Sequence, residues 1–164
     1  MQLLSNCTLD SEQPGGIPMS FRKLSAMLGV AVLAISCGAA AGEGPQKERH
    51  ELMEGVRDAA KVLGPMLKGD QEFDNAAAME SLRVWQSGAA KFGSLFPDGS
   101  QGGEAAPAVW EDRAGFDAAL AEWADAVDAA IAANPATLDE GRPVIGAAFS
   151  KCKNCHDTYR IESD

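Results

Sequence analysis

The positions of the apolar residues predict four amphipathic helices. In each of four segments, apolar side chains recur every three or four residues, which places them on one face of an α-helix. The segments run over residues 46–67, 75–92, 112–133 and 138–161. The third has the most regular stripe: Phe116, Leu120, Trp123, Val127 and Ile131. Four such helices, joined mostly by short links, predict an all-α fold, an antiparallel up-down-up-down four-helix bundle.

Local signals set the ends of these helices. Asp74 is a predicted N-cap for the second helix, and Thr137 with Glu140 has the spacing of a capping box for the fourth. Gly64-Pro65 should weaken the last turn of the first helix. Gly141 and Pro143 disturb the first turns of the fourth, so its regular part is expected to begin near residue 142.

The first 41 residues have the features of an export signal. Arg22 and Lys23 precede an apolar run over residues 24–36, and Ala39-Ala40-Ala41 is a small-residue cleavage site, giving a mature start at Gly42. Residues 33–37 alternatively resemble a lipobox, which would leave a lipidated Cys37 and the only expected membrane contact. Translation starts at Met1 or Met19. We expect residues 1–41 to be removed or processed and residues 42–164 to form one exported, periplasmic domain.

Composition narrows the class of partner. The net charge of −10 argues against binding to nucleic acid or to an anionic membrane surface. It fits a basic redox partner, although an acidic surface is equally typical of a soluble protein. The chain has only two histidines, and two of its four cysteines lie in the expected signal region, so no zinc site can be assembled.

A Cys-x-x-Cys-His motif near the C-terminus carries the predicted chemistry. Cys152 and Cys155 are three residues apart, so their thiols lie on neighbouring positions of a helix face and can form two thioether bonds to one edge of a haem. His156 would then lie under the iron as the proximal ligand. The alternative is a disulfide or thioredoxin-like redox pair. That pair normally opens a helix in a βαβ pattern, which this chain lacks.

The bundle topology selects a second ligand for the iron. The first and fourth helices run antiparallel, so the start of the first lies beside the haem-bearing end of the fourth. Met53 lies at that end, whereas Met66 lies about 20 Å further along the helix. Met53 is therefore the predicted sixth ligand. The alternative is that it only packs over an open iron face, as methionines on apolar stripes commonly do.

Several further residues are expected near the haem. Arg49 could pair with a propionate, and His50 could lie at the haem edge, although a surface position is the simpler interpretation for it. Arg160 is one turn beyond His156, where it would act on the proximal imidazole or cap the helix. The candidate pocket walls are Val56, Phe92, Phe96, Phe116, Leu120 and Tyr159.

Several segments of the sequence resemble those of a known protein family. The sequence from Phe149 to Arg160 resembles the haem-attachment segment of the cytochrome c′ family, or class II cytochromes c. Weaker matches are Leu63-Gly64 through Lys68-Gly69, Leu95-Phe96-Pro97, and Val109-Trp110-Glu111-Asp112. The resemblance implies a four-helix bundle with one covalent haem c, a bacterial periplasmic setting and often a homodimer.

The family divides by what its first helix places over the iron. In the resemblance, this distal position falls on Met53, the propionate arginine on Arg49 and the proximal arginine on Arg160. A methionine there is the pattern of low-spin members that carry electrons. We therefore predict an electron carrier with redox partner proteins, not an enzyme. The alternatives are a five-coordinate cytochrome that binds NO or CO, and a non-haem redox or disulfide protein.

Overall fold

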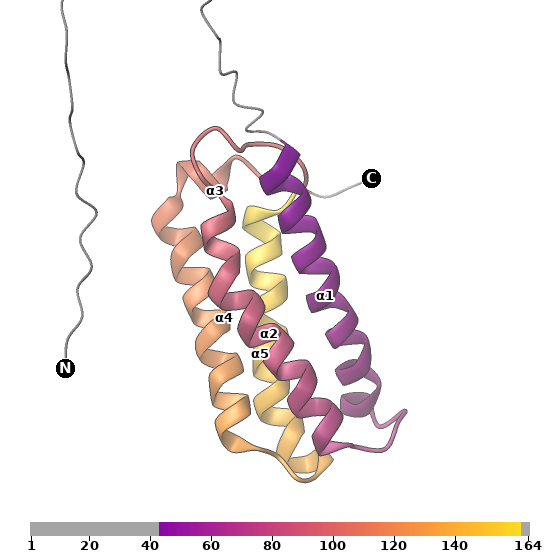
Figure 1. The fold of residues 1–164 in the computed structure, drawn as a ribbon. Helices are drawn as coiled ribbons and strands as arrows, with labels where there is room; N and C mark the ends of the chain where they lie inside the picture. Colours follow the sequence, from indigo (N-terminus) through magenta and orange to yellow (C-terminus); the bar gives the residue numbers. More distant parts are fainter. Residues whose placement is uncertain (1–42, 162–164) are drawn as a thin grey trace, which may run out of the picture. The chain divides into compact units, whose positions relative to one another are not determined.

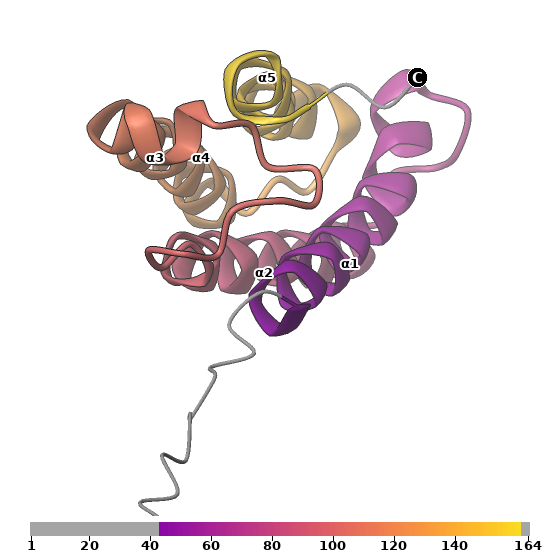
Figure 2. The same ribbon diagram turned by 90° about the horizontal axis from the view of Figure 1, so that it is seen from above.

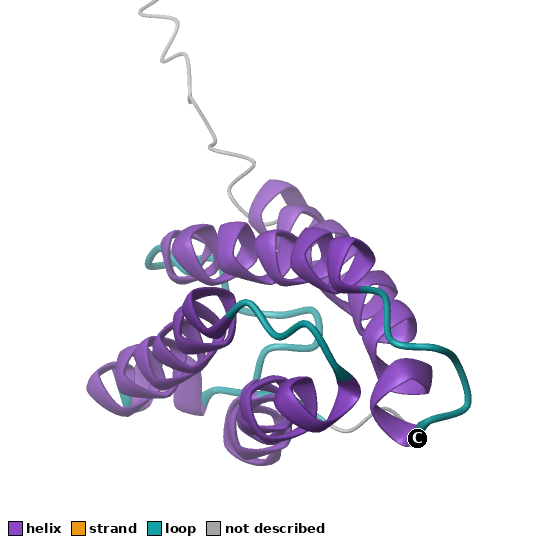
Figure 3. Cartoon of the chain, turned by 90° about the horizontal axis from the view of Figure 1, so that it is seen from below, coloured by secondary structure: helices purple, strands orange, loops and turns teal. Residues whose placement is uncertain are grey.

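Helices make up nearly all of the described part of the chain, residues 43–161 of a computed structural model (Figure 1). The α-helices are α1 (Glu43–Lys68), α2 (Asn75–Phe92), α3 (Ala108–Glu111), α4 (Arg113–Ala133) and α5 (Leu138–Tyr159), and a short 3-10 helix, η1, spans Gly93–Leu95. Figure 3 shows the helices joined by loops at their ends. The predictions for residues 1–41, including the signal and Cys37, lie outside the described residues.

The four long helices form a closed ring. α1 packs against α2 and α5, and α4 packs against the same two helices. Figures 1 and 2 show successive long helices running in opposite directions, so the start of α1 and the end of α5 lie at the same end of the bundle. The predicted antiparallel four-helix bundle is confirmed. No helix within residues 43–161 is both long and apolar enough to cross a bilayer.

The capping signals act as predicted. The Asp74 carboxylate accepts a hydrogen bond from Ala77 N at 3.1 Å, at the start of α2. Thr137 Oγ1 accepts from Glu140 N at 3.4 Å, and the Glu140 carboxylate accepts from Ala136 N at 2.8 Å. The capping box of α5 is therefore present, with its return bond shifted by one residue.

Two helix ends differ from the expectations. α1 continues through Pro65 to Lys68, and it stops where Gly69 adopts a φ of +83° that favours glycine. α5 is regular from Leu138, not from residue 142, because the Thr137 cap fixes its first turn. Gly141 makes that start fit, since a Cβ there would lie 2.8 Å from the Phe73 ring.

The buried side chains form two clusters. The larger runs along the bundle axis and contains Val56, Ala59, Leu63, Ala78, Met79, Leu82, Trp85, Trp123, Val127, Ala130, Ile145 and Ala148. The smaller lies where α1 begins and α5 ends, and it contains Leu95, Phe96, Val109, Phe116 and Leu120. Phe92, Trp110 and Tyr159 pack against the smaller cluster. The Cys-x-x-Cys-His motif on α5 is close to this second cluster.

Candidate haem site

The last turns of α5 carry the two predicted attachment cysteines. Cys152 and Cys155 are half-buried and do not form a disulfide within the described residues. Burial raises the pKa of both thiols, and for Cys155 burial together with the neighbouring Cys152 raises the pKa to about 11. Thiol–disulfide enzymes instead need a lowered pKa that exposes a reactive thiolate. The environment of these thiols therefore argues against the redox-pair alternative.

His156 follows the cysteines on the same helix. Partial burial lowers the pKa of its imidazole, and the positive charge of Arg160 lowers it further, against weaker opposing effects of Glu104 and Asp157. The neutral ring is consequently favoured. This is the form that can donate a nitrogen lone pair to a metal.

Met53 and the Cys-x-x-Cys-His motif line one pocket. The pocket has a volume of about 40 Å³ and is bounded by α1, α4 and α5. Its other lining side chains are mostly apolar; the full set is Met53, Val56, Ala119, Leu120, Trp123, Lys151, Cys152, Cys155 and His156. Two thiols, an imidazole and apolar walls are the groups that a covalently attached haem requires, and the Met53 thioether is a candidate second axial ligand. The residues present fit this cofactor.

The register of α1 against α5 supports this grouping. Arg142 Nε donates to the carbonyl of Leu67 at 3.1 Å near the other end of the bundle. Because the helices run antiparallel, equal steps along both from this contact reach the same level. Met53 and His156 lie the same number of positions from the contact, so they lie at the same level of the bundle.

Arg49 is built into a loop. Its side chain is 7% exposed, and its guanidinium donates to the carbonyls of Leu95, Ser100 and Gly102 and to Ser100 Oγ, at 2.9–3.4 Å. The guanidinium carbon also lies 4.7 Å from the centre of the Phe96 ring. Arg49 therefore fastens the loop after η1 to the start of α1. Its pairing with a propionate stays a prediction.

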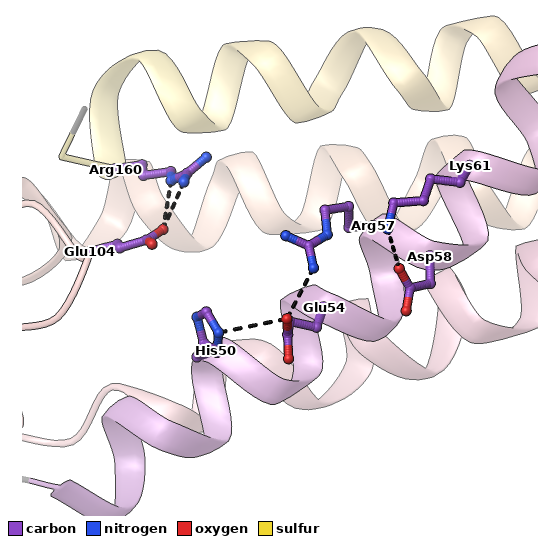
Figure 4. A network of polar contacts seen from close by, with 7 residues as sticks. All are labelled: His50, Glu54, Arg57, Asp58, Lys61, Glu104 and Arg160. Atoms are coloured by element: carbon purple, nitrogen blue, oxygen red, sulfur yellow. Dashed lines mark hydrogen bonds and ion pairs between the residues drawn. The ribbon is translucent and has the colours of Figure 1, made fainter. Parts of the chain in front are cut away.

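His50 and Arg160 lie in different surroundings (Figure 4). His50 is exposed, with Nε2 3.8 Å from the Glu54 carboxylate, in accord with a surface position. Arg160 Nε and Nη2 lie 2.9 and 2.8 Å from the Glu104 carboxylate. Backbone hydrogen bonds between residues 104–106 and 159–161 accompany this ion pair, at 2.9 and 3.0 Å. The loop before α3 is thus attached to the end of α5.

The candidate pocket walls divide into two groups. Val56 and Leu120 line the pocket. The aromatic candidates instead stack on one another toward the end of the bundle, with ring centres 4.8–5.3 Å apart in successive pairs along Phe92, Phe96, Phe116 and Tyr159. Tyr159 Oη also donates to the Asp112 carboxylate at 3.0 Å. These aromatic rings support the pocket from one end.

Some residues of the site are not predicted from sequence. Ala119 and Lys151 line the pocket, and Glu104 pairs with Arg160. Trp123 is predicted only as a core residue, yet it also lines the pocket. Its position on the apolar stripe predicts burial, but no sequence feature distinguishes a side chain packed in the core from one that lines a pocket. Glu104 lies in a loop without periodicity and gives no signal.

The fold and the site together define a class. A four-helix bundle that presents a Cys-x-x-Cys-His motif to a pocket between its helices is the architecture of a helical c-type cytochrome. Comparison with known proteins identifies the family of cytochromes. A sequence model described as Cytochrome C' matches residues 45–160, so the chain belongs to the cytochrome c′ family.

Individual relatives agree with this assignment. A cytochrome c′ of Rhodopseudomonas palustris is 36% identical over 120 residues, which cover 70% of this chain and 80% of the relative. A cytochrome c-556 of Agrobacterium fabrum is 31% identical over 129 residues, covering 78% and 88%. The solved structure of a Rhodopseudomonas palustris cytochrome c′ superposes with a TM-score of 0.68 at 32% identity, covering 73% of this chain and 98% of that one. As a member of this family, the chain binds one covalently attached haem c.

Proposed function

We propose that the protein carries single electrons as a monohaem cytochrome whose iron is ligated by His156 and Met53. The observation that carries this proposal is the shared pocket: Met53 from α1 and His156 from α5 line the same small cavity at the same level of the bundle. Cys152 and Cys155 would hold the haem covalently. The bound haem supplies a one-electron iron couple.

The chain's own groups suit that role. Burial and the charge of Arg160 lower the pKa of the His156 imidazole, which favours its neutral form, and Met53 offers an uncharged, soft sulfur. A histidine–methionine pair favours the reduced iron and so raises the potential, as in other electron-carrying cytochromes c. No acid–base chemistry is required of the site, in line with a carrier instead of an enzyme.

The second candidate is a five-coordinate cytochrome that binds NO or CO at an open distal face. It uses the same attachment residues and differs only in the role of Met53. The placement of Met53 in the pocket, level with His156, favours the first candidate. The proposal also includes redox partner proteins, a periplasmic location and the homodimer that the family resemblance implies.

Replacement of Met53 by alanine tests the proposal. The variant should lose the sixth ligand, so its ferric spectrum should become high-spin and its reduced form should bind CO. Met66→Ala is the matched control, because Met66 is a buried methionine on the same helix that does not line the pocket. That control should lose stability by about 2–5 kcal/mol but keep the parent spectrum. If the Met53→Ala variant kept the parent ligation, Met53 would be ruled out as an iron ligand.

A further inference from the structure

One polar atom at the pocket has no partner. Among the buried side-chain nitrogen and oxygen atoms of residues 43–161, only Trp123 Nε1 makes no hydrogen bond. The side chain is 5% exposed, so bulk water does not readily solvate it. Leaving such a donor unpaired costs about 1–3 kcal/mol, and an unpaired buried group in a native protein calls for a specific explanation.

A second tryptophan in the same core provides the contrast. The Trp85 and Trp123 rings are 6.5 Å apart between centres, and both are buried. Trp85 Nε1 donates to the carbonyl of Val56 at 2.9 Å. The core therefore satisfies the indole that does not line the pocket and leaves unpaired the indole that does.

Few groups around the pocket could accept this hydrogen bond. Lys151 only donates, and the alanine, valine and leucine side chains have no acceptor. The remaining groups are the sulfurs of Met53, Cys152 and Cys155 and the His156 ring. With haem attached, the cysteine sulfurs are thioethers and the His156 nitrogen faces the iron. A methionine sulfur bound to iron keeps a second lone pair that can accept weakly.

Among these groups, Met53 lies on the helix that the outer edge of the Trp123 ring approaches. A Cβ built on Gly88 of α2 would lie 3.0 Å from Val56 Cγ2 and 3.6 Å from Trp123 Cη2. The Trp123 ring therefore extends from α4 toward the side of the core where α1 and α2 meet. Met53 lies on α1, one turn before Val56, whereas the cysteines and His156 lie on α5.

We propose that Trp123 is a positioning residue for the distal ligand, and that in the haem-loaded protein its indole N–H donates a hydrogen bond to the Met53 sulfur. This inference rests on the proposed ligation by Met53. The bond holds the thioether in one orientation over the iron. It also draws electron density from the sulfur, which weakens donation to ferric iron and raises the reduction potential.

The test compares Trp123→Phe with Trp85→Phe in the haem-loaded protein. Trp123→Phe should lower the midpoint potential and shift the weak long-wavelength absorption band of methionine-ligated ferric haem. Trp85→Phe removes an indole N–H that is already bonded to Val56, so it should lower stability while leaving both haem properties close to the parent. A potential and band unchanged in Trp123→Phe would overturn the inference.

A double variant identifies the acceptor. In a Met53→Leu background, Trp123→Phe should no longer shift the potential, and persistence of the shift would rule out Met53 as acceptor. If Trp123→Phe does not accumulate, exchange of the Trp123 indole hydrogen in the reduced protein gives the same answer. It should be slow in the parent and faster in Met53→Leu, and equal rates would overturn the proposal.

The two proposals fail differently. A parent protein without the methionine band contradicts ligation by Met53 and, with it, the hydrogen bond. If the parent shows the band but the Trp123→Phe substitution changes neither the potential nor the band, only the proposed hydrogen bond is ruled out.

Discussion

The two ends of the bundle are closed in different ways. At the far end, short turns join α1 to α2 and α4 to α5, and each is closed by its own caps and backbone. Gly69 ends α1, Asp74 begins α2, and Asn134 ends α4 with a φ of 42°. Asn75 then ties the two turns together by donating to the carbonyl of Pro135 at 2.8 Å. The two turns themselves are set by caps close together in sequence, and the bonds from Asn75 to Pro135 and from Arg142 to Leu67 are the long-range contacts at this end.

The haem end is closed by one long loop between η1 and α3. Figure 2 shows this loop crossing the end of the bundle. Arg49 of α1 holds its first half, and the ion pair between Glu104 and Arg160 holds its second half beside α5. These contacts join residues about fifty positions apart in sequence. The loop thereby fixes both helices that carry the proposed iron ligands, a few residues away from each ligand.

The contrast explains how an internal pocket can keep its shape. The far end needs only to reverse the chain, so local turns suffice. Under the proposed ligation, the haem end must hold Met53 and His156 at a set separation, and a side chain from each helix is anchored in the same loop. Long-range contacts at this end serve the preorganisation of the site.

The largest expected effect comes from releasing the loop. Arg49→Met leaves the carbonyls of Leu95, Ser100 and Gly102 without their buried donor, so it should lower the free energy of unfolding by about 3 kcal/mol. Thr137→Ala removes a far-end cap and should cost only about 1 kcal/mol. Urea unfolding of the haem-loaded protein measures both. Equal costs at the two ends would contradict the comparison.

A smaller effect is expected from Gly115→Ala at the start of α4. A Cβ there would collide with the Asp112 carboxylate and the Tyr159 hydroxyl, which are hydrogen-bonded to each other. Displacing them should cost about 1–3 kcal/mol. Gly55→Ala is the control, because the space around this exposed helical glycine is open. It should stabilise the protein by up to about 1 kcal/mol. Loss of stability in both variants would indicate a general cost of the methyl group.

The smallest expected effect is a pH dependence of the chain without haem. The pKa of Cys155 rises from 9.0 to about 11 on folding, so the folded state holds its proton more tightly than the unfolded state. The resulting stability is fully present below pH 9 and is lost as the pH rises toward 11. Cys155→Ser should show a smaller loss, because only the raised pKa of Cys152 then remains. Urea midpoints across this range, compared between the two unloaded chains, check it; parallel curves would contradict the burial of the thiol.

The sequence predicts the parts of this molecule that depend on local pattern. The bounds of α2 are predicted correctly, because Asp74 gives a clear start and the apolar stripe ends at Phe92. The short helix α3 is missed, since four residues carry no periodicity. The predicted end at residue 161 for α5 is wrong by two residues, because Arg160 adopts an extended backbone to pair with the loop.

The site is predictable to the extent that topology alone determines it. The antiparallel order of the helices is enough to bring Met53 to the level of the motif, and both line one pocket in the folded chain. The sequence pattern does not indicate that Phe92 and Phe96 stack on each other instead of lining the pocket, nor that Trp123 has an unpaired N–H. Those facts depend on side-chain packing between elements that are distant in sequence.

The absorption spectrum of the purified, oxidised holoprotein tests the central claim most directly. Ligation by His156 and Met53 predicts a low-spin ferric spectrum with the weak long-wavelength band of a methionine-ligated haem, and a reduced form that does not bind CO. A high-spin ferric spectrum with ready CO binding would contradict it.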